Sequence, residues 1–296
     1  MARIGVTGSS GFIGSAVTAY LAARGDTVVR VTRPFEYHAL VNTFASVDVV
    51  IHLAGVVAST RTADFHAANV DATRIVARAA VDTATPMVHV SSLAAAGPAS
   101  PSRPRLEDDV PAPINAYGRS KLDGERAVIA TRDLQWTILR PGVVYGPGDR
   151  AMRPLFAYAR RGFLPLVGNP SAAYMFIYID DAVRAIAAAA DRECTHDTIF
   201  VAHERPISPR TLLETIRAAV NPSARLVPVP RAAVRVAALA GDCAGALTRR
   251  PATINSHRYV ELYARGFVCR VDRLTERLGV TPTIELADGI RRTLAS

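Results

Sequence analysis

Lysine is almost absent from this chain: of its 35 basic residues one is a lysine, Lys121, and the other 34 are arginines. Together with abundant alanine, this usage is typical of coding bias, so an arginine on the surface carries little information. The single lysine is the informative position, and its neighbours have to explain why it is kept.

Cysteine is also scarce, with three widely spaced residues, Cys194, Cys243 and Cys269. A small, odd number excludes a disulfide framework and a zinc cluster, and it favours a reducing compartment. The seven histidines show neither H-x-x-H nor H-E-x-x-H spacing, so we expect no metal.

Long apolar runs are missing as well. No stretch of about 18 uncharged apolar residues occurs, so we expect no integral membrane segment. The N-terminal residues MARIGVTGSSGFIG lack a charged leader followed by an apolar stretch and a cleavage site, which argues against export. We therefore expect a cytoplasmic protein.

What the chain does have is the composition of a globular protein, 49% hydrophobic and 21% charged over 296 residues. Its charge is lopsided, because residues 1–149 carry 14 basic and 13 acidic groups whereas 150–296 carry 21 and 13. A basic half is compatible with nucleic acid, an anionic substrate or a lipid surface. The arginines are dispersed and no nucleic-acid motif accompanies them, so we do not expect the protein to bind nucleic acid. The favoured interpretation is that the excess of arginine lies on solvated faces of helices.

Strands and helices alternate through the first half, which is typical of a doubly wound α/β fold with a parallel sheet covered on both faces. We expect strands over 4–7, 27–32, 48–53, 87–91 and 137–139, and helices over 12–23, 37–45, 63–82 and 116–131. The proline-rich stretch Gly97–Pro113 must be a loop.

After residues 146–148 the pattern changes, with a strand near 176–179 and helices over 208–219 and 231–247. We assign residues 1–146, with about 176–202, to a dinucleotide-binding domain. Residues 147–175 and 203–296 form a smaller, mostly helical C-terminal lobe for the substrate.

A glycine-rich turn links the first strand to the first helix, with Gly8, Gly11 and Gly14 in a G-x-x-G-x-x-G spacing. Such glycines let the backbone approach a pyrophosphate, whose charge the helix N-terminus stabilises. The second strand ends at Arg33 with no acid before Glu36. An arginine there pairs with a 2′-phosphate, so NADP(H) is favoured, while NAD(H) stays open.

Tyr117 and Lys121 lie four residues apart, on one face of a helix. A free tyrosine titrates near pH 10, and an adjacent cation stabilises the phenolate and lowers the phenol pKa. Ser91 and Ser92, at the end of an upstream strand, strengthen this motif. The pattern indicates a tyrosine acting in proton transfer.

The chain resembles the extended short-chain dehydrogenases/reductases, the NAD(P)-dependent epimerase/dehydratase group with a Rossmann fold. The resemblance rests on the segments TGSSGFIG (7–14), HLAG (52–55), NVDAT (69–73), VHVSSLAAAG (88–97), YGRSK (117–121), LRPGVVYGPGD (139–149) and IYIDDAVRAI (177–186). They cover the first 190 residues in the order of the family, whereas the C-terminal third matches in general layout only.

The resemblance implies the roles of the site residues. Tyr117 is the general acid/base, Lys121 binds the nicotinamide ribose, and Ser92, five residues before Gly97, polarises the substrate carbonyl. Asn69 matches the asparagine of the family on a neighbouring helix, with a catalytic or a structural role. The remaining cofactor contacts are Gly8, Gly11, Phe12, Ile13, Gly14, Arg33, Leu53, Ala54, Gly55, Pro141, Gly142 and Val143.

The chain departs from the family in three places. About 14 residues separate Arg33 from the strand at Asp48, so the usual extra strand near the adenine is lost. Nucleotide-sugar enzymes commonly have Asn at the position of Val143 and an Arg-Asp pair where this chain has Tyr174 and Met175. The substitutions predict a more apolar pocket.

The candidate substrate residues are Tyr145, Arg150, Phe156, Phe163 and Tyr174, with plain core packing as the alternative. The Ala/Val-rich segment 227–247 is interpreted as a packed lobe helix, with a lid or a membrane-surface helix as alternatives.

We therefore expect an NADP(H)-dependent carbonyl reductase or alcohol dehydrogenase for a fairly apolar small molecule. The alternatives are a nucleotide-sugar epimerase or dehydratase and a non-catalytic dinucleotide-binding regulatory protein. The resemblance also implies a homodimer through the helices at 63–82 and 116–131.

Overall fold

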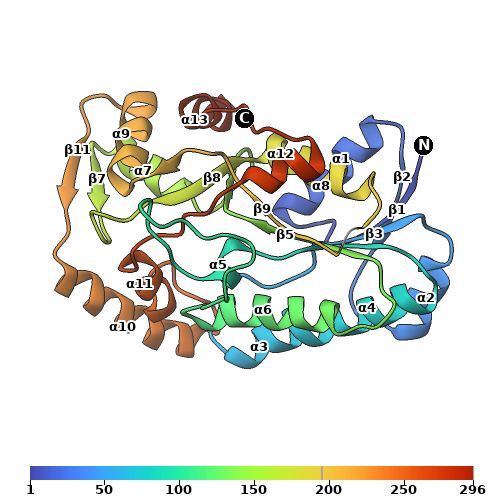
Figure 1. Ribbon diagram of the computed structural model, residues 1–296. Helices are drawn as coiled ribbons and strands as arrows, with labels where there is room; N and C mark the ends of the chain where they lie inside the picture. Colours follow the sequence, from blue (N-terminus) through green and yellow to red (C-terminus); the bar gives the residue numbers. More distant parts are fainter. Residues whose placement is uncertain (195, 296) are drawn as a thin grey trace.

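A computed structural model describes residues 1–194 and 196–295. Its centre is a six-stranded parallel sheet in the order β2-β1-β3-β4-β5-β9, as Figure 1 shows. The strands are β1 Arg3–Thr7, β2 Thr27–Val31, β3 Val49–His52, β4 Met87–Val90, β5 Trp136–Pro141, β6 Val143–Tyr145, β7 Phe163–Leu166, β8 Tyr174–Tyr178, β9 Thr198–Val201, β10 Pro206–Ile207 and β11 Arg225–Pro228.

Helices cover both faces of the sheet. Those of the first part are α1 Phe12–Ala23, α2 Tyr37–Phe44, α3 Thr62–His66, the π-helical turn η1 Ala67–Asp71, α4 Ala72–Asp82, α5 Leu93–Ala96 and α6 Ala116–Ile129. Those of the second part are α7 Arg153–Arg160, α8 Ile179–Ala190, α9 Pro209–Val220, α10 Arg231–Thr248, α11 Ser256–Leu262, α12 Asp272–Leu278 and α13 Leu286–Ala295.

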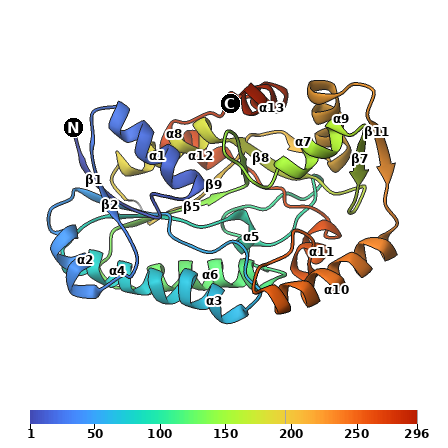
Figure 2. The same cartoon turned by 180° about the vertical axis from the view of Figure 1, so that it is seen from behind.

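The central strands β3 and β4 are buried along their whole length, because α1, α8 and α12 lie on one side of the sheet and α2, α4 and α6 on the other (Figures 1 and 2). A parallel sheet covered in this way needs apolar residues on both faces, which explains the continuous runs of the sequence. The expected doubly wound α/β fold is confirmed.

The helix expected at 63–82 is present over residues 62–82. The π-helical turn η1 joins its two α-helical parts, α3 and α4. Between β2 and β3 the described chain holds α2 and no strand, so β2 is the edge of the sheet. The loss of the extra strand follows from the short connection, which has room for one crossover helix only.

The second part of the chain adds small sheets to its helices. β6 pairs in parallel with β8, and β10 pairs antiparallel with β8, while β7 pairs with β11. β9 returns to the main sheet beside β5. One apolar core runs through both parts, so the proposed domain boundaries stay a prediction. Among the described residues, no helix is both long and apolar enough to cross a membrane.

Candidate active site

The glycine-rich turn closes tightly between β1 and α1. Gly8 has a φ of +68°, and a methyl group built on it would lie 2.7 Å from the backbone nitrogen of Ala54. A methyl group on Gly14 would lie 2.0 Å from the Gly8 carbonyl oxygen. A side chain at either position would therefore displace the backbone.

The beginning of α1 suits a pyrophosphate. Gly11 is the N-cap residue and no side chain caps the helix, so its first N–H groups are free for an anion. Phe12 and Ile13 are half-buried and pack against the main core, which fixes the direction of the helix. The predicted cofactor turn therefore has the geometry that a dinucleotide requires.

A cavity of about 370 Å³ lies at the carboxyl end of β2. Arg33 and Phe35 form one wall, and the Arg33 guanidinium lies 5.8 Å from the centre of the Phe35 ring. Val56, Ile75 and the carboxylates of Asp64 and Asp71 also line it. Arg33 is exposed, and the described residues include no ion-pair partner for it within 4 Å. The cavity and the free cation fit the adenosine end of a dinucleotide.

Ser92 and Tyr117 come together because α5 packs closely on α6. A methyl group on Gly118 would lie 2.6 Å from the Ala94 carbonyl oxygen, so only glycine permits this approach. Ser92 is the N-cap of α5, where its hydroxyl accepts a hydrogen bond from Ala94 N at 3.2 Å. Ser92 also acts on Tyr117, because it lowers the pKa of the phenol against the larger effect of burial.

Lys121 lies one turn below Tyr117 and is 6% exposed. Its Nζ donates to the Val90 carbonyl oxygen at 2.9 Å, so the end of β4 holds the ammonium in place. Burial lowers the pKa of Lys121 to about 8, while the carboxylate of Glu125 acts in the opposite direction.

The pKa of Tyr117 is raised, chiefly by burial, and Glu261 contributes further, while Ser92 and Arg258 oppose the rise. The sequence argument predicted a pKa lowered by Lys121. The structure differs because the loss of solvation is the dominant cause, and the lysine ammonium donates to a backbone carbonyl.

Asn69 lies in the π-helical turn η1 and is 1% exposed. Its amide binds both backbone groups of Val56, at 2.7 and 3.0 Å, and donates to Ser120 Oγ at 2.9 Å. A methyl group on Gly55 would lie 2.8 Å from Asn69 Oδ1 and 3.9 Å from Lys121 Nζ. The hydrogen bonds of Asn69 thus hold the loop after β3 in place beside Lys121. This favours a structural role for Asn69.

A buried hydrogen-bonded network of side chains lies behind the loop that follows β3, and it was not predicted from the sequence. His52 Nδ1 lies 2.7 Å from Thr7 Oγ1, which accepts a hydrogen bond from Ala54 N at 3.2 Å. His52 Nε2 lies 3.0 Å from Thr73 Oγ1. Burial lowers the pKa of His52 to about 3, so the ring is neutral and acts as a hydrogen-bonding spacer. Its position in the HLAG segment was the available signal.

Two polar residues near Tyr117 were also missed. Asn115 caps α6 by accepting from Gly118 N at 2.8 Å, and its amide donates to Glu261 Oε1 at 2.7 Å. Glu261 belongs to α11 in the C-terminal part, where Arg258 donates to it at 3.0 Å. An asparagine two residues before the tyrosine is recognisable as a cap, whereas nothing local indicates its partner 146 residues away.

The candidate substrate residues do not converge. Tyr145 is 1% exposed, with its ring against Gly289 and Phe176, and Phe156 is also buried in the main core. Phe163 is on β7 beside Tyr158, and Arg150 is exposed. Tyr174 alone reaches the surroundings of Tyr117, since its hydroxyl donates to the Glu261 carbonyl oxygen at 3.2 Å.

The predicted cofactor residues Leu53, Ala54, Pro141 and Val143 follow the carboxyl ends of β3 and β5, at the edge of the sheet that carries the glycine turn. Pro141 is buried and Val143 is 43% exposed. In doubly wound folds ligands bind at this edge.

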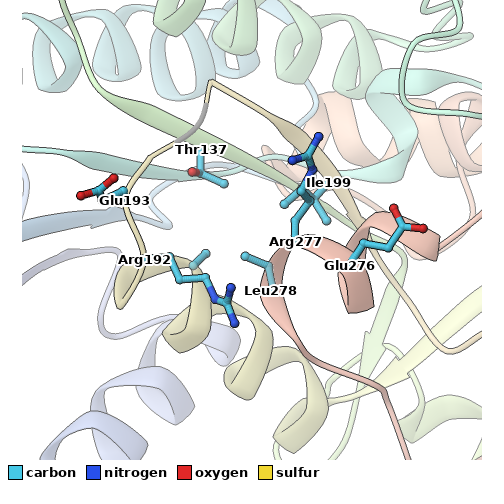
Figure 3. A pocket seen from close by; sticks show the side chains of 8 residues that line it. Thr137, Arg192, Glu193, Ile199, Glu276, Arg277 and Leu278 are labelled. Atoms are coloured by element: carbon cyan, nitrogen blue, oxygen red, sulfur yellow. The ribbon is translucent and has the colours of Figure 1, made fainter.

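A second cavity, of about 440 Å³, lies at the opposite edge of the sheet (Figure 3). Thr137 and Ile199, near the amino ends of β5 and β9, line it together with Arg192 and Glu276. Its place at the amino ends of the strands separates it from the glycine turn.

The fold and this constellation define a nucleotide-binding α/β enzyme. The family model for the NAD-dependent epimerase/dehydratase family matches residues 4–202. The chain therefore belongs to this family, as an enzyme of the extended short-chain dehydrogenase/reductase type that uses a nicotinamide dinucleotide.

Two curated relatives are similar over nearly the whole chain. A 2-alkyl-3-oxoalkanoate reductase of Stenotrophomonas maltophilia is 28% identical, with 99% of each chain covered. A ceramide reductase of Caulobacter vibrioides is 26% identical, over 98% of this chain and 93% of the relative. Among solved structures, UDP-glucuronic acid 4-epimerase from Bacillus cereus, in complex with UDP-glucuronic acid and NAD, has a TM-score of 0.77 at 20% identity, covering 99% and 98% of the two chains.

Proposed function

We propose that the protein is an NADP(H)-dependent reductase, or in reverse an alcohol dehydrogenase, for a fairly apolar ketone. A nicotinamide dinucleotide held at the glycine-rich turn would supply or accept the hydride at the carbonyl carbon. Tyr117 gives its phenolic proton to the carbonyl oxygen, and Ser92 holds that oxygen with a hydrogen bond. Lys121 binds the ribose hydroxyls and provides the positive charge beside Tyr117.

One arrangement carries the proposal: the close packing of α5 on α6 at Gly118 brings Ser92, the N-cap of α5, to Tyr117 on α6, and the buried ammonium of Lys121 lies one helical turn further along α6. Two hydroxyls on one carbonyl oxygen are the arrangement that proton transfer requires. We propose the cofactor contacts inferred from the sequence for the same site, with Arg33 selecting the 2′-phosphate.

The surroundings favour an apolar substrate. The ring centres of Phe65 and Tyr117 lie 6.2 Å apart. The ring of Tyr174 stacks on that of Phe267, with 6.3 Å between their centres. Val143, which is 43% exposed, occupies a position where nucleotide-sugar enzymes commonly carry an asparagine, whereas Met175 is 1% exposed and belongs to the core. The two curated relatives are named as reductases, which supports the same proposal.

A panel of alkyl-chain ketones, followed by the decrease of NADPH absorbance, tests the reaction. We expect stoichiometric oxidation of NADPH with 3-oxoacyl compounds and none with UDP-sugars. Isomerisation of a UDP-sugar without net loss of the reduced cofactor would instead establish the epimerase alternative.

The substitution Tyr117→Phe tests the mechanism. Because the variant lacks the proton donor, we expect kcat to fall by about 10²–10⁴-fold while the NADPH dissociation constant changes less than about twofold. Tyr20→Phe is the matched control, because Tyr20 lies on the exposed side of α1. Full activity of Tyr117→Phe would disprove the mechanism without affecting the cofactor assignment.

A further inference from the structure

Helix α10 exposes an apolar face to solvent along its whole length. Its packed side is a narrow stripe of Val234, Ala238, Gly241 and Gly245. The opposite side is formed, at 100° per residue, by Ala232, Ala233, Val236, Leu239, Ala240, Cys243, Ala246 and Leu247, all of which are exposed. Val236 is 66%, Leu239 54% and Leu247 86% exposed.

Arginines flank this face at both ends of the helix. Arg231 and Arg235 occupy the first turns, and Arg249 and Arg250 follow the last. Within residues 225–265 there are seven arginines and two acidic residues. One acid, Asp242, accepts hydrogen bonds from the backbone and hydroxyl of Ser256, so it is engaged within the protein.

The helix is firmly attached to the rest of the molecule. A methyl group on Gly241 would lie 2.0 Å from the Ile254 carbonyl oxygen, and one on Gly245 would lie 3.1 Å from Thr60 Cγ2. Figures 1 and 2 both show α10 along the outer edge of the molecule, beside α11. Its apolar face is therefore held outward by the fold.

The charge distribution argues against a second copy of this chain on the same face. If two α10 helices pair in parallel, like ends meet; if they pair antiparallel, Arg231 and Arg235 meet Arg249 and Arg250 of the other copy. Either arrangement brings arginines together without carboxylates to compensate them. An anionic surface, in contrast, offers negative charges to the arginines at both ends of α10 at the same time.

We propose that α10 lies in the interface of a membrane that contains anionic lipids. Its apolar face enters the boundary of the acyl chains, and Arg235, Arg249 and Arg250 bind the headgroup phosphates. Arg231 donates to the Tyr259 hydroxyl at 3.0 Å and lies over the Tyr263 ring, so it is engaged within the protein. An 18-residue helix is about 27 Å long, which places Arg235 and the pair Arg249 and Arg250 over different lipids.

Membrane binding by α10 goes beyond the proposed function, and it would place the proposed active site close to the membrane. α10 rests on Thr60, and the neighbouring helix α11 contacts Phe65 through His257 at 6.3 Å between ring centres. Phe65 in turn contacts Tyr117. The membrane-bound helix would thus lie next to the elements that surround the proposed site, as a lipid-derived ketone requires.

Co-sedimentation with lipid vesicles tests the proposal without any turnover. We expect the protein to bind vesicles of phosphatidylcholine that contain about 30% phosphatidylglycerol, and to bind pure phosphatidylcholine vesicles much more weakly. Val236→Asp is expected to lower the partition coefficient more than about tenfold, because it places a charge in the apolar face. Val110→Asp is the matched control, since Val110 is an 83% exposed valine in a distant loop.

The arginines are tested separately. Arg249→Ala with Arg250→Ala should lower binding to the anionic vesicles about 25-fold, because each arginine near such a surface contributes about a fivefold increase. A fluorophore on Cys243 should shift to the blue when these vesicles are added, in a Cys194→Ser background, since Cys243 is exposed on the apolar face and Cys269 is buried.

Three results would overturn the proposal: no binding to anionic vesicles, equal losses in Val236→Asp and Val110→Asp, or a label on Cys243 that does not respond. If instead Val236→Asp turns a dimer into a monomer in sedimentation velocity, the face belongs to a second copy. NADPH oxidation with a soluble short-chain ketone should be unchanged in Val236→Asp, so failure of membrane binding is separable from failure of the proposed reaction.

Discussion

Arg33 illustrates how much depends on one side chain at the edge of the sheet. Because β2 is the edge strand of the sheet in the described part of the chain, this arginine and Phe35 form a wall of the cavity where we propose that the adenosine end binds. An acidic residue at the end of β2 would bind a ribose hydroxyl, whereas a cation there attracts a 2′-phosphate.

We predict that Arg33→Ala raises the dissociation constant for NADPH about tenfold or more, as expected for a lost charge-assisted hydrogen bond, and leaves that for NADH within about twofold. Titration of the reduced cofactors by fluorescence measures both. Arg3→Ala is the control, since Arg3 is exposed at the amino end of β1. An unchanged NADPH preference in Arg33→Ala would show that another group selects the cofactor.

Lys121 is predicted to give the reaction a pH limit. Its pKa of about 8 lies below the ordinary value of 10.5, so the ammonium is charged below pH 8 and loses its proton above it. We expect kcat/KM for ketone reduction to fall as the pH rises through about 8, because the charge beside Tyr117 is lost.

Lys121→Arg separates this effect from other titrations. A guanidinium stays charged throughout this range but has the wrong shape for the site, so we expect a lower rate without the decrease near pH 8. The same decrease in both proteins would assign the pH limit to another group.

At the scale of elements, a buried ion pair joins α6 to the sheet. Arg140 on β5 donates to both oxygens of Glu125, at 3.0 and 2.7 Å, and Ser91, directly after β4, donates to the same carboxylate. Glu125 is 1% and Arg140 5% exposed. This ion pair holds α6, the helix that carries Tyr117, against the end of β4, after which Ser92 follows.

We predict that Glu125→Gln lowers the free energy of unfolding by about 3–5 kcal/mol, because it leaves a buried guanidinium uncompensated. Asp123→Asn removes an exposed partner of Arg126 on the same helix and should cost at most about 1 kcal/mol. Urea unfolding followed by circular dichroism gives both values. Equal losses would mean that burial of the pair is not the cause.

The elements themselves were largely predictable. The first strands and helices appear where apolar periodicity and the glycine turn indicate, and the helices at 208–219 and 231–247 are α9 and α10 within one residue at each end. The π-helical turn at Asn69 and the short strands β6, β7, β10 and β11 were not anticipated. Short strands carry little periodicity, and pairing between distant segments decides whether they form.

For the whole molecule, the layers place the helical runs 62–82 and 116–129 side by side on one outer face (Figure 2). We keep the prediction of a homodimer through these helices. Light scattering should give the mass of two chains. Ile129→Glu, at an exposed position of α6, should produce a monomer, whereas Leu106→Glu, outside the helices, should not. A monomeric wild-type protein would contradict the prediction.

The amino-acid pattern was enough to predict the fold class, which the structure confirms, because glycine spacing and strand–helix alternation are local properties. The glycine turn and the motif of Ser92, Tyr117 and Lys121 were predicted as a site for the same reason, and these roles stay a prediction. Only the tertiary structure decided that Asn115 meets Glu261, that Glu125 pairs with Arg140, and that Tyr145 belongs to the core. These contacts join segments far apart in the chain, and burial makes each polar group depend on the partner that the fold brings to it, which no local pattern encodes.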